Sequence, residues 1–397
     1  MKNQGMSLAN YKIFRRLMMV ETVSLGTGWR IGNRFKSSLG TLLKVSTGAR
    51  QLGCFGYSPH IVYELTGSCN LNCLHCHAAG GKKYPNELST DNAKKALKSL
   101  ATLKDFKILV FSGGEPLLRE DIWEITGYAR DLGFELLFAT NATLVTKEVA
   151  RKMARLKVLG AAVSLDSIKP EVHDKLRGVA GSWERAINGI KNIVAEKMFL
   201  QINVTANKTN IKEIPELIKF ADNLGAHVIF LYTFVPVGRG EDNKWLALDP
   251  DDFVNLVNDT IKLQSRVQAI ITPVALPWYF AYLVSKSKIP PSIAKEWITG
   301  CGAAKGMINI KPDGTAWPCP FMPLDSGNVL NMSAKEIWNG TIFRSIRDRN
   351  NFSEPCKSCY YRDVCGGCRV RAYIRTGSQL DADPICPLGI DNNSFKI

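Results

Sequence analysis

Residues 59–235 alternate short apolar runs rich in β-branched side chains with amphipathic segments of helical period. Alternation of this kind predicts repeated β/α units with right-handed crossovers and a parallel sheet. Six such units predict an α/β fold built as a partial or complete barrel, with its active site at the carboxyl ends of the strands. Ser89 and Ser182 are the predicted N-caps of two of its helices. The predicted strands are 61–66, 107–112, 135–140, 160–166, 200–206 and 227–232, and the predicted helices are 89–102, 120–131, 146–157, 182–196 and 211–224.

Unusual polar stretches follow four of these strands directly. The first strand leads into a cysteine-rich loop, and the next three lead into SGGEP (112–116), TNAT (140–143) and SLDS (164–167). Because the carboxyl ends of parallel strands share one rim, we expect these stretches to lie together.

The cysteines are clustered. Ten of the eleven fall within 69–76 or 301–386, and Cys54 stands apart as an ordinary buried thiol. A chain of 397 residues can bury a large core and needs no disulfide staples. The clustering therefore predicts metal ligation in a reducing, cytoplasmic compartment.

The first group, CNLNCLHCHAAGG (69–81), contains two overlapping motifs. Cys73–His77 matches the C-x-x-C-H pattern of covalent haem attachment, whereas the x3 and x2 spacing of the three cysteines suits a cubane with one iron left open. Haem attachment normally accompanies export, and the N-terminus has no secretory h-region. A structural zinc site would need a second ligand pair, which does not occur before residue 301. The cluster interpretation is favoured, and His75 and His77 are interpreted as packing or solvent-facing loop residues.

Cys69, Cys73 and Cys76, followed one strand later by the 113–116 GGEP turn, resemble the radical S-adenosylmethionine (SAM) superfamily. The resemblance implies a [4Fe–4S] cluster whose open iron chelates the methionine end of SAM. It also implies reductive cleavage of SAM to a 5′-deoxyadenosyl radical, with electrons from a donor such as ferredoxin or flavodoxin.

The resemblance extends to further cofactor contacts. The GGEP turn is expected to hold the SAM amino group, and later residues are expected to contact its ribose or carboxylate. Each of the later residues has the alternative role of a cap or a surface ion pair. The expected SAM-binding residues are Gly113, Gly114, Glu115, Asn141, Ser164, Asp166 and Arg177.

The second cysteine group resembles the SPASM domain, which binds two auxiliary [4Fe–4S] clusters. The alternative is one zinc site made by the pairs 356/359 and 365/368, which would leave three cysteines unexplained. The x2 spacing of the last pair differs from the x3 of many SPASM enzymes. The resemblance assigns Cys301, Cys319 and Cys368 to one cluster, and Cys356, Cys359, Cys365 and Cys386 to the other.

Several stretches, including VPVGRG (235–240) and residues 365–386, resemble haem-synthase and related tetrapyrrole enzymes of the alternative haem pathway. That resemblance implies oxidative decarboxylation of iron-porphyrin propionates to vinyl groups. An aromatic wall from PWYFAY (277–282) and cationic clamps from Arg239, Arg369 and Arg371 would suit such a substrate. The alternative is that these aromatics belong to the core and the arginines are solvated.

Two other functions remain open. Many SPASM proteins are maturases that modify a peptide, a protein or a tungsten-enzyme cofactor, although the short basic N-terminus makes a poor leader-binding domain. An electron-transfer or cluster-carrier protein is disfavoured by the open-iron loop and the GGEP turn. Measuring SAM cleavage would separate the carrier from both enzymes.

The formal charge of +15 is concentrated at the N-terminus, where residues 1–55 carry nine Lys or Arg and one acid. We expect this leader to be partly ordered, with peripheral membrane contact as an alternative. Nucleic-acid binding is disfavoured because no reading module accompanies the charge. The predicted domains are a leader (1–55), a barrel with a helical extension (56–298) and a SPASM domain (299–397).

Overall fold

The computed structural model describes residues 52–53 and 59–387, apart from 265, 288–289 and 297. The predicted N-terminal leader lies almost entirely outside these residues. Within them, no helix is both long and apolar enough to cross a membrane.

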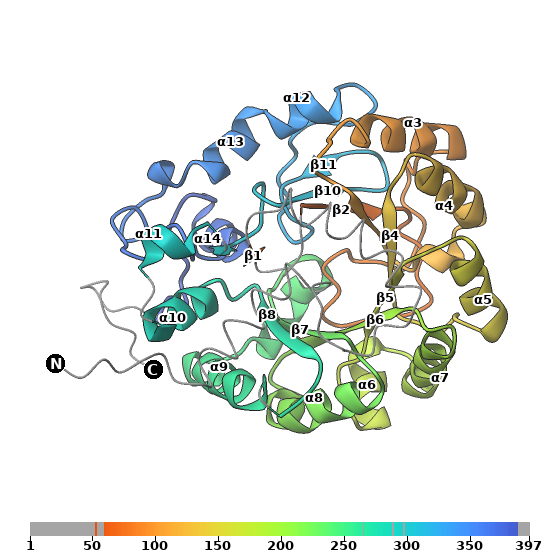
Figure 1. The fold of residues 1–397 in the computed structure, drawn as a ribbon, viewed down its shortest axis with the longest axis horizontal. Coiled ribbons are helices and arrows are strands. Elements are labelled where there is room, and N and C mark those ends of the chain that lie inside the picture. Colours follow the sequence, from red (N-terminus) through yellow and green to blue (C-terminus); the bar gives the residue numbers. More distant parts are fainter. Residues whose placement is uncertain (1–51, 54–58, 265, 288–289, 297, 388–397) are drawn as a thin grey trace.

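The core of the fold is a nine-stranded sheet in the order β11-β10-β2-β3-β4-β5-β6-β7-β8. From β10 to β8 every neighbouring pair is parallel, and only β11 runs antiparallel to its neighbour. The sheet curves into an open barrel with helices on its outside (Figure 1). The predicted α/β partial barrel is confirmed. Its strands are β2 (His60–Glu64), β3 (Ile108–Ser112), β4 (Glu135–Thr140), β5 (Gly160–Ser164), β6 (Phe199–Ala206), β7 (Val228–Thr233), β8 (Ile270–Val274), β10 (Met307–Ile310) and β11 (Ala316–Trp317).

Amphipathic helices connect the strands and cover the outer face of the barrel (Figure 1). The first helix buries Ala93, Ala96, Leu97 and Leu100 at helical spacing, and the Ser89 hydroxyl accepts a hydrogen bond from Asn92 N as the predicted N-cap. These helices are α3 (Thr90–Leu100), α4 (Ile122–Asp131), α5 (Lys147–Arg155), α6 (Pro170–Arg177), α7 (Ser182–Ala195), α8 (Ile214–Asn223) and α9 (Pro250–Gln264), with 3₁₀ turns η1 (Pro116–Leu118), η2 (Ile211–Glu213) and η3 (Gly238–Leu246).

Two expectations for this region were wrong in detail. Ser182 is the first helical residue of α7 rather than its N-cap, which is Gly181, and the Ser182 hydroxyl donates to Asp174 at 2.8 Å. Within the region expected to be helical, 270–274 forms β8. Pro273 is tolerated there because β8 is an edge strand, where a missing N–H breaks no ladder on its outer side.

The C-terminal part of the chain packs on the barrel and adds strands to it. β10 pairs with β2 in parallel, and Lys311 Nζ lies 2.5 Å from Glu64 Oε2 in a buried ion pair. The division at residue 298/299 remains a prediction, because strands from both sides of it share one sheet. The remaining elements are β1 (Leu52–Gly53), α10 (Trp278–Ser287), α11 (Pro291–Ala294), β9 (Ile298–Gly300), α12 (Ala334–Trp338), α13 (Thr341–Arg347), η4 (Arg349–Asn351) and α14 (Arg369–Thr376).

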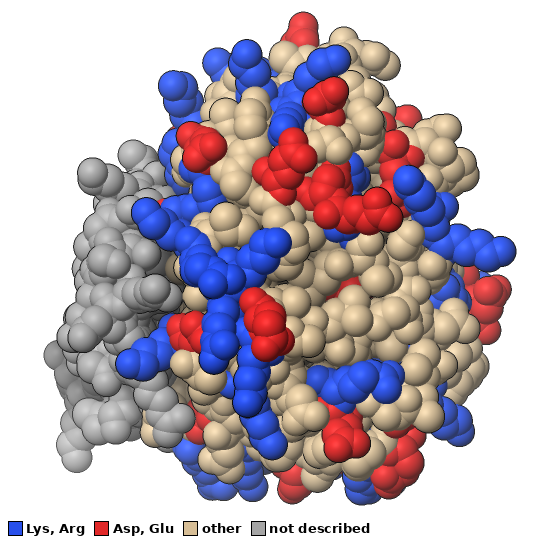
Figure 2. Space-filling view, turned by 90° about the vertical axis from the view of Figure 1, so that its right-hand side faces the viewer, with Lys and Arg blue, Asp and Glu red and all other residues tan. Residues whose placement is uncertain are grey.

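One face of the molecule is shown in Figure 2. Lys and Arg side chains occur there beside Asp and Glu side chains, so this face carries both signs of charge.

Candidate active site

The GGEP turn makes a close approach to the cysteine loop. Gly113 has φ +133°, and a Cβ there would overlap the Thr66 carbonyl oxygen. A Cβ on Gly114 would overlap the Ser68 carbonyl oxygen, which accepts a hydrogen bond from Glu115 N at 2.7 Å. Glycine is therefore required at both positions by backbone proximity and, at Gly113, also by conformation.

Glu115 is buried beneath this turn rather than exposed to the cavity. Its carboxylate accepts hydrogen bonds from Thr140 Oγ1 at 2.7 Å, from Asn141 N at 2.8 Å and from Leu117 N at 3.3 Å. Burial raises the pKa of Glu115 to about 7, although the three donors oppose the shift. Glu115 thus ties the end of β3 to the end of β4.

Neighbouring elements hold the cysteine loop. Asn72 N and Leu74 N donate to the carbonyls of Arg177 and Leu176 at the end of α6, at 3.0 and 2.9 Å. On the other side, Arg239 Nη1 donates to Cys73 O at 2.9 Å. The stretch containing VPVGRG therefore supports the loop.

Each cysteine sulfur of the first group accepts a hydrogen bond. Leu71 N donates to Cys69 Sγ at 3.4 Å, and Gly80 N donates to Cys76 Sγ at 3.3 Å. The third donor is Arg177 Nη1, 3.7 Å from Cys73 Sγ. Burial raises the pKa of the Cys69 thiol to about 11, so an external positive charge such as iron is needed to hold it as a thiolate.

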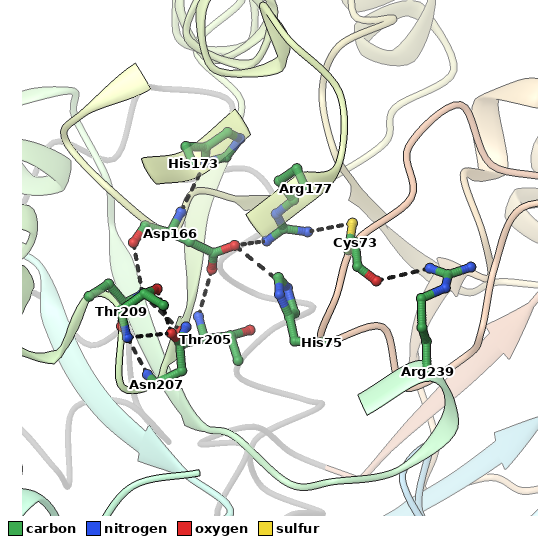
Figure 3. A network of polar contacts seen from close by, with 10 residues as sticks. Cys73, His75, Asp166, His173, Arg177, Thr205, Asn207, Thr209 and Arg239 are labelled. Atoms are coloured by element: carbon green, nitrogen blue, oxygen red, sulfur yellow. Dashed lines mark hydrogen bonds and ion pairs between the residues drawn. The ribbon is translucent and has the colours of Figure 1, made fainter. Parts of the chain in front are cut away.

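Arg177 joins this loop to a buried carboxylate (Figure 3). Its Nη2 lies 2.7 Å from Asp166 Oδ2, and Thr205 N donates to Asp166 Oδ1 at 2.8 Å. The Arg177 guanidinium is the main influence that lowers the pKa of Asp166 against its desolvation. Asp166 is thus a buried support for Arg177, whereas Arg177 itself reaches the cavity wall.

His75 and His77 also lie at the cavity. His75 Nε2 is 3.6 Å from Asp166 Oδ2, and the His77 ring packs at a tilt against Phe321 with 4.5 Å between ring centroids. Burial lowers the pKa of both imidazoles to about 4, so the His75 contact is polar and not an ion pair. His75 confirms the packing interpretation, but its contact with Asp166 had no signal in the sequence.

The three cysteines open onto a cavity with about 1360 Å³ of empty space, part of which is open solvent at its mouth. Five of the seven predicted SAM-binding residues line the same cavity as the cysteines. They are Gly113, Gly114, Asn141, Ser164 and Arg177. The other two, Glu115 and Asp166, are fully buried and do not line the cavity. The strands contribute both apolar and polar side chains, and Phe230, Tyr232, Phe234 and Phe321 also line the cavity.

Of the two alternatives for the aromatic residues 277–282, a substrate wall or part of the core, the structure supports the core. Trp278, Tyr279 and Phe280 are each at most 1% exposed, and none of them lines this cavity. The expected clamps are also committed elsewhere. Arg239 binds the cysteine loop, Arg369 donates to the carbonyl of Asp381 at 2.8 Å, and Arg371 pairs with Asp383 at 2.8 Å.

The second cysteine group divides into two sets in space. Cys319 and Cys368 lie close enough to Cys301 for a thiolate charge on Cys301 to raise the pKa of both. The other four cysteines line a separate small cavity, which Cys368 does not line. The zinc arrangement is therefore not supported, because it requires Cys368 beside Cys365. Cys356, Cys359, Cys365 and Cys386 form the second set.

These three thiol sets fit iron–sulfur clusters. The first has three thiols beside a large cavity, as a SAM-binding cluster requires, and the third has four thiols around a smaller space. Within the described part of the chain, no three His, Cys, Asp or Glu side chains converge tightly enough for a single metal ion. The assignment of individual ligands stays a proposal.

Comparisons with known proteins agree with this arrangement. The Radical SAM superfamily matches residues 63–221, and the SPASM iron–sulfur cluster-binding domain matches residues 301–360. AdoMet-dependent heme synthase of Methanosarcina barkeri is 35% identical, over 82% of this chain and 95% of that protein. Mycofactocin maturase of Mycobacterium tuberculosis is 32% identical, over 83% of each chain.

Solved structures show the same fold. Streptococcus suis SuiB bound to S-adenosylmethionine superposes with a TM-score of 0.66 at 20% identity, covering 95% of this chain and 88% of that one. The cofactors are accordingly SAM, its [4Fe–4S] cluster and two auxiliary [4Fe–4S] clusters. With both domains matched and a relative 35% identical along nearly its whole length, the chain belongs to the radical SAM superfamily, among the members that carry a SPASM domain.

Proposed function

We propose that this radical SAM enzyme oxidatively decarboxylates propionate side chains of an iron-porphyrin. Each conversion removes one hydrogen atom, one electron and CO2 from a propionate and leaves a vinyl group. The observation that carries the proposal is the 35% identity to a heme synthase over 95% of that protein's length.

The cofactors would be held by the residues described above. Cys69, Cys73 and Cys76 would hold the cluster, and Gly113 and Gly114 would present backbone groups to SAM. When SAM is bound and the cluster is reduced, the cluster and SAM together would supply a 5′-deoxyadenosyl radical that abstracts hydrogen. The chain's own part is to orient the substrate and exclude water, for which the largely apolar cavity is suited.

The aromatic lining supports a flat substrate. Phe321, from the C-terminal part, packs against both His77 and Tyr232, with ring centroids 4.5 and 6.1 Å away. The three rings form a wall against which an apolar macrocycle can pack. Gln201, Asn203 and Thr205 supply uncharged polar groups on the same cavity.

The enzyme would also need an electron donor and an electron acceptor. The electron that the cluster needs would come from a small donor of the ferredoxin or flavodoxin type, and the electron released with CO2 would pass to an auxiliary cluster. Cytoplasmic location and membrane contact through residues 1–55 also remain predictions.

The test is an anaerobic assay of the reconstituted enzyme with dithionite, SAM and iron-coproporphyrin III. We expect stepwise mass losses of CO2 plus two hydrogen atoms, with 5′-deoxyadenosine formed in step. Cys73→Ala, which removes one cluster ligand, should form neither product. Deoxyadenosine without any change in the porphyrin mass would refute the substrate while leaving the enzyme class intact.

A second candidate is modification of a peptide. It is favoured by the 32% identity to mycofactocin maturase, a relative matched over 83% of its length. In that case the same assay would consume SAM only when a peptide substrate replaces the porphyrin.

A further inference from the structure

Trp278 faces the cavity of the four-cysteine set. It is the first residue of α10, which follows the last barrel strand, and its side chain is 1% exposed. It lines the cavity together with Cys356, Cys359, Cys365 and Cys386. A barrel-side helix therefore contributes one wall of a site whose thiols all come from the C-terminal part of the chain.

The indole nitrogen of Trp278 has no partner among the described residues. Nε1 is buried and no acceptor lies within hydrogen-bonding distance. An indole N–H is a donor only, and buried donors in folded proteins are nearly always paired. Trp278 lines the four-cysteine cavity, so a sulfur of the group that fills this cavity is an acceptor within the same site.

The same cavity already shows N–H groups directed at sulfur. Gly367 N donates to Cys365 Sγ at 3.3 Å, and the backbone of Tyr361 donates to Cys359. Arg362, also on the wall, has its Nη1 bound to the Lys357 carbonyl at 3.0 Å. Trp278 would add a side-chain donor to this set of backbone donors.

We propose that Trp278 Nε1–H donates a hydrogen bond to a sulfur of the auxiliary cluster held by these four cysteines, and thereby raises that cluster's reduction potential. Reduction adds negative charge that is spread over the sulfurs. A donor aimed at one of them stabilises the reduced form more than the oxidised form. The inference rests on the iron–sulfur assignment of the SPASM domain and is independent of the substrate.

The first test compares Trp278→Phe with the wild-type holoenzyme. Phenylalanine retains most of the aromatic bulk and removes the donor. We expect unchanged iron content and about a tenfold smaller equilibrium constant for one-electron reduction of one auxiliary cluster, which corresponds to a potential lower by about 59 mV. Redox titration followed by electron paramagnetic resonance measures this. Tyr279→Phe removes a hydroxyl from the next residue, which does not line the cavity, and should leave all three potentials unchanged.

A second test needs no variant. Wild-type enzyme containing ¹⁵Nε1-labelled tryptophan should show ¹⁵N hyperfine coupling to a reduced auxiliary cluster in pulsed electron paramagnetic resonance. Unchanged potentials in Trp278→Phe, or no coupling in the labelled wild type, would overturn the proposal. Should Trp278→Phe assemble fewer clusters, the labelled wild-type spectrum decides.

Discussion

Arg177 lies between Cys73 and Asp166, with Nη1 3.7 Å from the sulfur and Nη2 2.7 Å from the carboxylate. One guanidinium therefore donates a hydrogen bond to a cysteine sulfur and also neutralises a fully buried carboxylate. Removing one partner of a buried ion pair leaves the other charge uncompensated.

Arg177→Met should lower the free energy of unfolding by about 3 to 5 kcal/mol, because Asp166 loses its counter-charge. Asp166→Asn added to this variant should restore part of the loss. Anaerobic urea denaturation measures both. As a control, Lys94→Met breaks an exposed pair with Glu124 and should have a much smaller effect. Equal effects of the Lys94 and Arg177 variants would contradict this account.

Glu115 should make stability depend on pH. Its pKa rises from 4.5 in the unfolded chain to about 7 in the folded protein, so the folded state binds the proton more tightly. Its contribution therefore favours folding most below pH 4.5 and declines as the pH rises through 7.

The check is chemical denaturation between pH 5 and 8, roughly the window of the shift. Glu115→Gln should flatten this decline, while leaving one buried N–H unpaired at a cost of about 1 to 3 kcal/mol. Glu148→Gln, at an exposed position of α5, should keep the wild-type pH profile. A wild-type profile in Glu115→Gln would show that Glu115 is not the group responsible.

Gly113→Ala should abolish SAM binding, because a Cβ would overlap the Thr66 carbonyl and φ is +133°. Gly127→Ala, in the middle of α4 with open space around it, should bind SAM normally and gain roughly 1 kcal/mol of stability. Equilibrium dialysis with labelled SAM measures the difference. Wild-type affinity in Gly113→Ala would mean that the turn tolerates displacement and does not present its backbone to SAM.

Phe321→Ala should weaken iron-porphyrin binding, since it removes the ring that packs against both His77 and Tyr232. A loss of roughly tenfold or more in affinity is expected for one stacked aromatic ring. Titration of the Soret band measures it. Tyr128→Ala, on the outer helix α4, removes an aromatic ring that does not line the cavity and should bind as the wild type does. Equal binding by both variants would place the porphyrin elsewhere.

The two thiol sets predict different cluster losses. Cys319→Ala and Cys356→Ala should each lose about one cubane's worth of iron and sulfide, but from different auxiliary clusters. Electron paramagnetic resonance of the reduced proteins distinguishes the remaining signals. Cys54→Ala, at the cysteine outside both sequence groups, should retain full iron. Identical spectra for the two SPASM variants would contradict the division.

Local patterns were sufficient to predict the first cysteine loop, the GGEP turn and six barrel strands. The x3–x2 spacing and the strand-end position of the turn are contained within short stretches of sequence. β8 was missed because Pro273 and Pro277 obscure an apolar run that the edge position makes acceptable.

Contacts between distant residues could not be predicted in this way. Arg239 was expected at the substrate, yet it binds Cys73 O, 166 residues away in the chain. Likewise, nothing adjacent to Trp278 indicates that it shares a cavity with cysteines 78 to 108 residues further on. Side-chain partners of this kind depend on how the C-terminal part packs on the barrel.

The pairing of β10 with β2 has a consequence for biosynthesis. Glu64 emerges from the ribosome 247 residues before Lys311, its buried counter-charge. Until then the first strand has an open edge and an acid without its lysine, both of which favour chaperone binding over completion of the sheet. The edge of β2 is therefore covered only after β10 and Lys311 have been translated.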